Sequence, residues 1–84
     1  MRRAIRERGL LVDAEERLNQ LLGTRLRGIR KEHGLTLKQL ANKTSLSVSL
    51  ISQIELGKSA ASVSTLRKLS TALGVPLARL FEGL

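Results

Sequence analysis

The chain has 84 residues and a formal net charge of +8, which leaves room for one small domain and favours a polyanionic partner. It contains no Cys, so disulfides, thiolate metal sites and cysteine nucleophiles are excluded, and its one His, His33, cannot build a zinc site alone. Its only aromatic residue, Phe81, argues against recognition of single strands by base stacking. No apolar run has the length of a membrane span or the form of a signal peptide, so we expect a cytoplasmic protein.

Residues 1–12 are basic and end in a small apolar patch. We interpret them as a basic N-terminal arm whose solvated end can be frayed or disordered. Two other interpretations stay open. A basic arm can follow a nucleic-acid backbone or enter a minor groove, or its apolar residues can pack on a partner chain: Ile5, Leu10, Leu11 and Val12.

A helix is predicted from Asp13, which can serve as its N-cap, to about Glu32. We expect Gly23 to weaken or interrupt this helix. Its cations can touch phosphate, but such charges more often form a solvated face, so none is assigned to a site: Arg25, Arg27, Arg30 and Lys31. Its buried stripe is expected to contain Leu18, Leu21, Leu22, Leu26 and Ile29.

Two short helices joined by a tight turn are predicted over residues 36–57. Thr36 and Gln39 form a capping box for a first helix of about 37–43. Such a unit is typical of a helix-turn-helix, which places side chains in the major groove of DNA.

The second helix of this motif is predicted over about 47–56, after a turn at 44–46. Ser47 is its expected N-cap, and Gly57 follows its last periodic residue. Helical spacing predicts burial of Leu50, Ile51 and Ile54.

The outward face of the second helix carries short or polar side chains that suit base edges. Gln can bond adenine in bidentate fashion, Ser can bond several bases, and Val can touch a thymine methyl. The N-terminal amides of either helix can also bind a phosphate oxygen. The residues predicted to face the bases are Val48, Ser49, Ser52 and Gln53.

Two further helices are expected after the motif. Ser62 can cap a helix of about 63–73, with Leu66, Leu69, Ala72 and Leu73 facing inward. Pro76 suits the first turn of a last short helix, from which Phe81 is expected to plug the core.

From about Leu22 to Phe81 the chain resembles the phage-repressor/Cro class of DNA-binding domains, also called the xenobiotic-response-element class. The matching segments are RLRGIRKEHGLTLKQLA, LSVSLISQIELGK and SVSTLRKLSTALGVPLARLF. The segment SVSLISQIE, followed by GK and GVPL, is particularly similar to bacterial regulators that carry a sensory cupin domain.

This resemblance implies an all-α, compact five-helix domain over residues 13–84, after the basic extension of residues 1–12. It also implies a salt bridge between Arg30 and Glu55. Leu37, Ser45, Leu56 and Ala61 depart from the residues common at their positions, and Ser45 would cost stability if its φ is positive. The residues expected to contact phosphates are Thr36, Lys38, Ser47 and Lys58.

Motif and charge together lead to one functional hypothesis. The chain would bind double-stranded DNA in sequence-specific fashion as part of a bacterial or phage transcriptional regulator, a repressor in many members, associated with the nucleoid. We expect a homodimer on a palindromic operator, no cofactor, and an effector domain that a longer regulator would add. An enzyme is not expected, because no acid–base pair, phosphate loop or metal cluster is evident. The alternative is an antitoxin-like or coactivator-like protein-interaction module with the same fold.

Overall fold

The computed structural model describes the backbone of residues 2–84 and the side chains of residues 14–84. This part of the chain is all-α, as expected, and contains no strand. Four α-helices and one 3₁₀ helix replace the expected five helices, because the last segment forms only a tight 3₁₀ turn after Pro76. The elements are α1 (Arg2–Glu32), α2 (Leu37–Thr44), α3 (Val48–Glu55), α4 (Val63–Leu73) and η1 (Leu77–Phe81).

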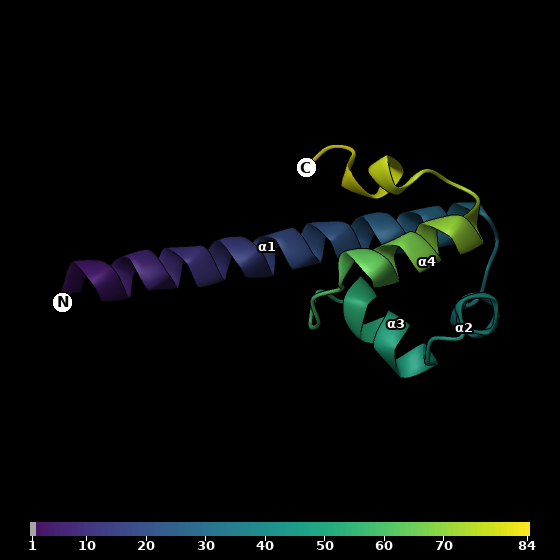
Figure 1. Ribbon diagram of the computed structural model, residues 1–84, viewed down its shortest axis with the longest axis horizontal. Coiled ribbons are helices and arrows are strands. Elements are labelled where there is room, and N and C mark those ends of the chain that lie inside the picture. Colours follow the sequence, from purple (N-terminus) through teal and green to yellow (C-terminus); the bar gives the residue numbers. More distant parts are fainter. Residues whose placement is uncertain (1) are drawn as a thin grey trace.

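Helix α1 differs most from its prediction. It begins at Arg2 rather than at Asp13, because the upstream segment is rich in good helix formers such as Arg, Ala, Glu and Leu. The N-terminal half of α1 extends beyond the other helices (Figure 1). The interpretation of residues 1–12 as a basic, solvated arm, with its alternatives of a DNA contact or a partner contact, concerns side chains outside the described residues and stays a prediction.

Gly23 lies inside α1 and does not interrupt it, and whether it weakens the helix stays a prediction. A Cβ atom at this position would lie 2.3 Å from the carbonyl oxygen of Ile54 and 2.5 Å from that of Glu55. The absence of a side chain therefore lets α1 and α3 cross in backbone contact.

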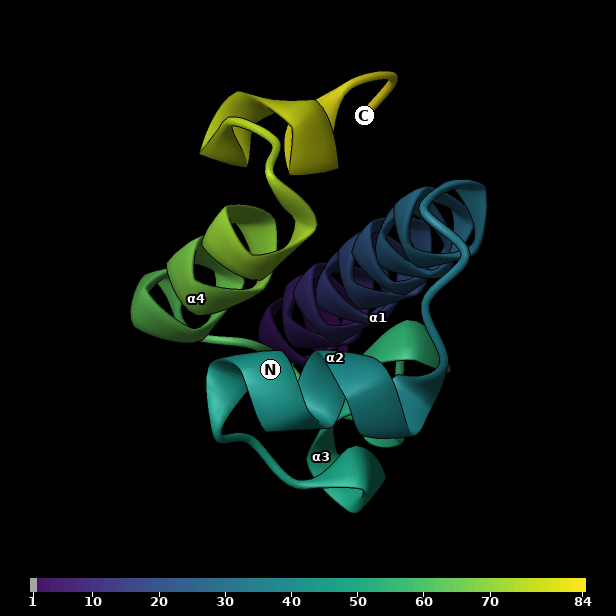
Figure 2. The same cartoon turned by 90° about the vertical axis from the view of Figure 1, so that its right-hand side faces the viewer.

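Helices α1 and α4 occupy the middle of the domain, with α2 and α3 on one side and η1 on the other (Figures 1 and 2). The core lies where these elements meet, and each contributes at least one fully buried side chain. The largest of these are Leu26, Ile29, Leu40, Ile51, Leu69 and Leu80.

Three residues expected in the core are exposed. Leu18 and Leu21 are 44% and 45% exposed. Leu18 precedes Gln20, the residue of α1 that lies against Gly57, and Leu21 lines an open hollow beside the C-terminal segment. Phe81 is 41% exposed, and Leu80 takes the core position instead. In a 3₁₀ helix the inward direction repeats every three residues, so Leu77 and Leu80 face the core together.

Candidate nucleic-acid interface

Helix α2 is anchored at both ends by side-chain-to-backbone hydrogen bonds. The predicted capping box is confirmed: the amide of Gln39 donates to Thr36 Oγ1 at 3.1 Å, and the amide of Thr36 donates to Gln39 Oε1 at 2.8 Å. At the other end, Thr44 Oγ1 donates to the Leu40 carbonyl at 2.8 Å and accepts from the amide of Leu46 at 3.3 Å. The buried Thr44 thus ends α2 and begins the turn.

The turn itself requires a left-handed residue. Ser45 has φ 61°, the only positive φ of a non-glycine residue among the described positions. The strain anticipated at this position is therefore present, because an L-residue crowds its Cβ against the following carbonyl in this conformation. The turn reverses the chain tightly enough to bring α3 across α2.

Helix α3 begins as predicted, with Ser47 Oγ accepting from the amide of Leu50 at 3.0 Å. Ile51 and Ile54 are buried on its inner face. Leu50, also predicted to be buried, is half-buried and packs at the edge of the core.

A buried ion pair fixes the C-terminal end of α3 to α1. Arg30 Nε and Nη2 donate to the two carboxylate oxygens of Glu55 at 2.7 and 2.9 Å, which confirms the expected bridge. Arg30 Nη1 also donates to the Leu35 carbonyl at 2.8 Å. The hydrogen bond that Arg30 donates to Glu55 raises the pKa of Arg30, burial lowers it, and the negative charge of Glu55 raises it further, so this guanidinium stays charged at any working pH.

The outer face of α3 reaches the surface where the sequence predicted. Val48 is 42% exposed, Ser49 is exposed, and Ser52 and Gln53 are half-buried. No base-facing candidate is enclosed within the monomer, and all four share the side of α3 opposite Ile51 and Ile54. Their role in base reading stays a prediction.

The predicted phosphate-contacting residues surround this face, and all four are exposed: Thr36, Lys38, Ser47 and Lys58. The hydroxyls of Thr36 and Ser47 accept amides within their own helices, yet each keeps its O–H free to donate to an anion. Among the described residues, the amides of Leu37 and Lys38 donate to no protein acceptor, as expected at the start of a helix. These donors are available to a phosphate oxygen.

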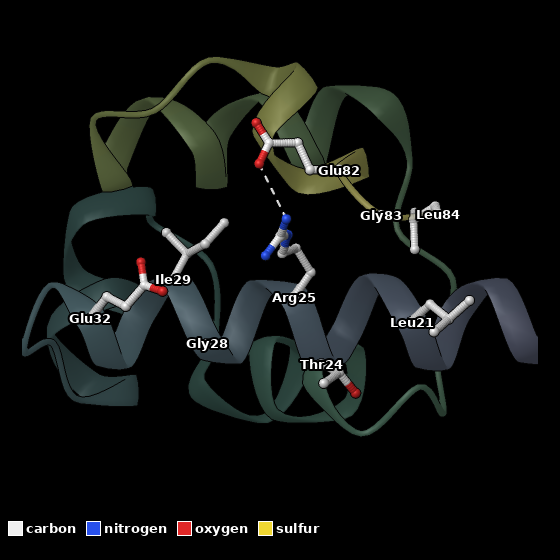
Figure 3. A pocket seen from close by; sticks show the side chains of 9 residues that line it. All are labelled: Leu21, Thr24, Arg25, Gly28, Ile29, Glu32, Glu82, Gly83 and Leu84. Atoms are coloured by element: carbon white, nitrogen blue, oxygen red, sulfur yellow. Dashed lines mark hydrogen bonds and ion pairs between the residues drawn. The ribbon is translucent and has the colours of Figure 1, made fainter.

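A hollow of about 300 Å³ lies on the opposite side of α1, against the C-terminal segment (Figure 3). Its charges are paired across it: Arg25 Nη2 lies 3.2 Å from Glu82 Oε2, and Arg79 contacts both Glu32 and Glu82. Leu21 and Leu84 add apolar lining at one end. Because Arg25 and Arg79 are paired with Glu32 and Glu82, these two cations are not free to bind a phosphate.

Sequence reasoning missed two features of the interface. One is the backbone contact at Gly23, and the other is a smaller hollow beside α3 that contains Arg27, a residue first interpreted as part of a solvated face. The glycine itself was the only signal for the contact. Residues 14–84 contain no group of three side chains able to hold a metal ion, and the described helices include none long and apolar enough to cross a membrane.

The capped α2, the left-handed turn and the clamped α3 with a free outer face define a helix-turn-helix domain of the kind found in DNA-binding regulators. The chain belongs to the helix-turn-helix family HTH_3, which matches residues 26–80. This membership confirms the expectation of a regulator domain rather than an enzyme.

Known relatives are regulators. The chain is 39% identical over 61 residues to the HTH-type transcriptional regulator SutR of Escherichia coli (strain K12), which covers 73% of this chain and 34% of SutR. It is 44% identical over 54 residues to the immunity repressor protein of Bacillus phage phi105, covering 64% of this chain and 38% of that protein. The matched segment amounts to 34% to 46% of the length of such curated relatives.

Solved structures show the same architecture. The restriction-modification controller protein C.AhdI from Aeromonas hydrophila superposes with a TM-score of 0.74 and 33% sequence identity. That match covers 75% of this chain and 96% of C.AhdI. This chain therefore shares its fold with that controller protein.

Proposed function

We propose that this domain binds double-stranded DNA in a sequence-specific manner, as the DNA-reading part of a bacterial or phage transcriptional regulator. The supporting observation is the position of α3: its inner face is buried and clamped to α1, while its outer face carries exposed or half-buried polar groups. A helix held in this way can enter a major groove without reorganising, with α2 bracing it across the phosphate backbone.

Each base-facing candidate has a defined chemistry. Gln53 can donate and accept together, which suits the N6 and N7 positions of adenine, and Val48 can contact a thymine methyl group. The short side chains of Ser49 and Ser52 let the helix backbone approach the base edges. Around them, Lys38 and Lys58 supply charge for phosphates, with the hydroxyls of Thr36 and Ser47 beside the helix ends.

A homodimer on a palindromic operator belongs to the same proposal. One helix-turn-helix module makes a contact of only about 600–1,000 Å², so two copies provide the affinity and specificity that one lacks. Their half-sites would lie about 34–36 Å apart, or a multiple of that distance. Since the curated relatives are longer than the matched segment, an additional effector-binding domain in the whole regulator, and its association with the nucleoid, are part of the proposal.

Selection of bound sequences from a random duplex pool tests this function. We expect enrichment of one motif with two symmetry-related halves, and a random-looking bound pool would refute sequence-specific reading. Gln53→Ala should lower the preference for the enriched motif over random duplex, whereas Lys58→Ala should weaken both equally and flatten the salt dependence. Equal loss on both duplexes for Gln53→Ala would exclude its role in base reading.

A further inference from the structure

An open groove of about 510 Å³ lies between the C-terminal end of α2 and one side of α4, two helices that pack against each other (Figure 2). Neither an aspartate nor a glutamate lines it. We call it the Lys43 groove, and its exposed lining residues are Lys43, Ser45, Ser64, Arg67, Lys68 and Thr71.

Helical periodicity explains why these residues of α4 share one side. Ser64, Arg67 and Lys68, and Thr71 follow one another at three or four residues, which is one face of a helix. The core residues of α4 occupy another face, so this polar face does not help to hold the domain together. Across the groove, α2 ends and the left-handed turn begins.

The groove gathers three positive charges that no described acid compensates. Lys43, Arg67 and Lys68 form no ion pair with a carboxylate of residues 14–84. The dipole of α2 favours a cation at Lys43, in its last turn, but Arg67 and Lys68 lie in the middle of α4 and gain nothing comparable. Since like charges repel, this cluster costs some stability unless an anion occupies the groove.

Hydroxyl groups add hydrogen-bond donors between the charges. Ser45, Ser64 and Thr71 are exposed, and each carries an O–H that can donate to an oxygen anion. Ser45 holds its hydroxyl there in the left-handed conformation, with φ 61°. A glycine would adopt this conformation without strain but would remove the donor.

The chemistry of the groove favours an occupant with several carboxylates on a flexible chain. An exposed ion pair contributes only about 1.4- to 5-fold in affinity, so an anion with a single charge would gain little here. Duplex DNA carries many charges, but it is stiff, and no residue proposed to contact DNA lines the groove. A polypeptide can instead place single Asp and Glu side chains between two helices.

We infer that the Lys43 groove docks an acidic segment of a partner protein. The carboxylates of that segment pair with Lys43, Arg67 and Lys68, and the hydroxyls of the groove donate to the remaining oxygens. This inference goes beyond the proposed DNA binding and does not depend on it. Because α3 and the groove use different residues, one domain can hold DNA and the partner together.

The test titrates the full chain, labelled with ¹⁵N, with capped hexaglutamate and follows the amide resonances by NMR. We expect saturable shifts confined to residues 43–45 and 64–72, and none with capped hexaglutamine. The variant Arg67→Gln/Lys68→Gln removes two ion pairs from exposed positions and should weaken hexaglutamate binding roughly 6-fold. The matched control, Arg17→Gln/Lys31→Gln, removes the same charge from exposed positions of α1 outside the groove and should leave the affinity unchanged.

Three results would overturn the inference. One is the absence of saturable shifts with hexaglutamate, and another is an equal loss of affinity in both double variants, which would show attraction to the net charge alone. The third comes from duplex DNA: a smaller salt slope for the groove variant than for the control would assign the groove to phosphates. The peptide titration needs no DNA, so a chain that fails to bind any duplex would refute the proposed function and leave this inference to be decided by the peptide.

Discussion

Gly23→Ala is expected to destabilise the domain, although alanine is the better residue for a helix interior. The new methyl group would lie 2.3 Å from the Ile54 carbonyl oxygen and 2.8 Å from the Glu55 carbonyl carbon. Both are backbone atoms, so no side-chain rotation can relieve the overlap. The axes of α1 and α3 would have to separate by roughly 0.7 Å, the difference between 2.3 Å and the shortest tolerated Cβ contact of 3.0 Å.

The expected change in the free energy of unfolding of Gly23→Ala is the sum of two opposing contributions. Overpacking in a well-packed interior costs about 1–3 kcal/mol, and the gain in helix propensity from Gly to Ala offsets about 1 kcal/mol of it. Gly28→Ala is the matched control on the same helix, because its Cβ would meet nothing within 4 Å. Gly28→Ala should gain about 1 kcal/mol of stability from helix propensity alone. Both variants share this gain, so the difference between their free energies of unfolding measures the overlap at Gly23, about 1–3 kcal/mol.

Urea unfolding followed by circular dichroism at 222 nm measures both variants, since the chain has no Trp or Tyr for fluorescence. A midpoint for Gly23→Ala below wild type, with Gly28→Ala above it, is the expected result. If both variants were stabilised equally, α1 and α3 would not be in backbone contact at Gly23. The clamped geometry of α3 proposed to support DNA reading would then need revision.

Three further substitutions test the motif, each by thermal or urea unfolding. Glu55→Gln should cost about 3–5 kcal/mol because it leaves the buried Arg30 without its counter-charge; since a guanidinium stays charged throughout this range, the loss should not vary between pH 6 and pH 9. Ser45→Gly should stabilise the domain by about 0.5–1 kcal/mol by relieving the left-handed conformation, and no gain would exclude strain at this φ. Thr36→Ala should cost about 1 kcal/mol through the lost N-cap, and an unchanged midpoint would show that water replaces the capping bond.

The sequence was sufficient to predict the helix caps, because each cap is an interaction between residues close together in the chain. Thr36, Ser47 and Ser62 cap the helices that follow them, and Gly74 ends α4, as predicted. Each of these bonds joins atoms only three or four residues apart, so residue type and spacing define it completely. The face of α3 follows in the same way from the spacing of Ile51 and Ile54.

The failures occurred where burial depends on partners distant in sequence. Leu18 and Leu21 continue the apolar pattern of Leu26 and Ile29, yet they are 44% and 45% exposed, because no other element covers them as the core covers Leu26 and Ile29. Hydrophobic periodicity identifies a face of a helix, but it does not show how far along that face a partner extends. For the same reason Arg27 could not be distinguished from an ordinary surface cation before α1 was placed against α3.

Glu55 connects these observations, because α1 contacts it in two ways. The backbone of Gly23 touches its carbonyl group, and the guanidinium of Arg30 holds its side chain. A residue fixed through both backbone and side chain defines the axis of α3 at its C-terminal end, while Ser47 and the left-handed turn define its N-terminal end. An eight-residue helix in isolation would not be stable. Fixing both ends through neighbouring elements therefore gives α3 the rigidity that the proposed base reading requires, and leaves its outer side chains free to contact a ligand.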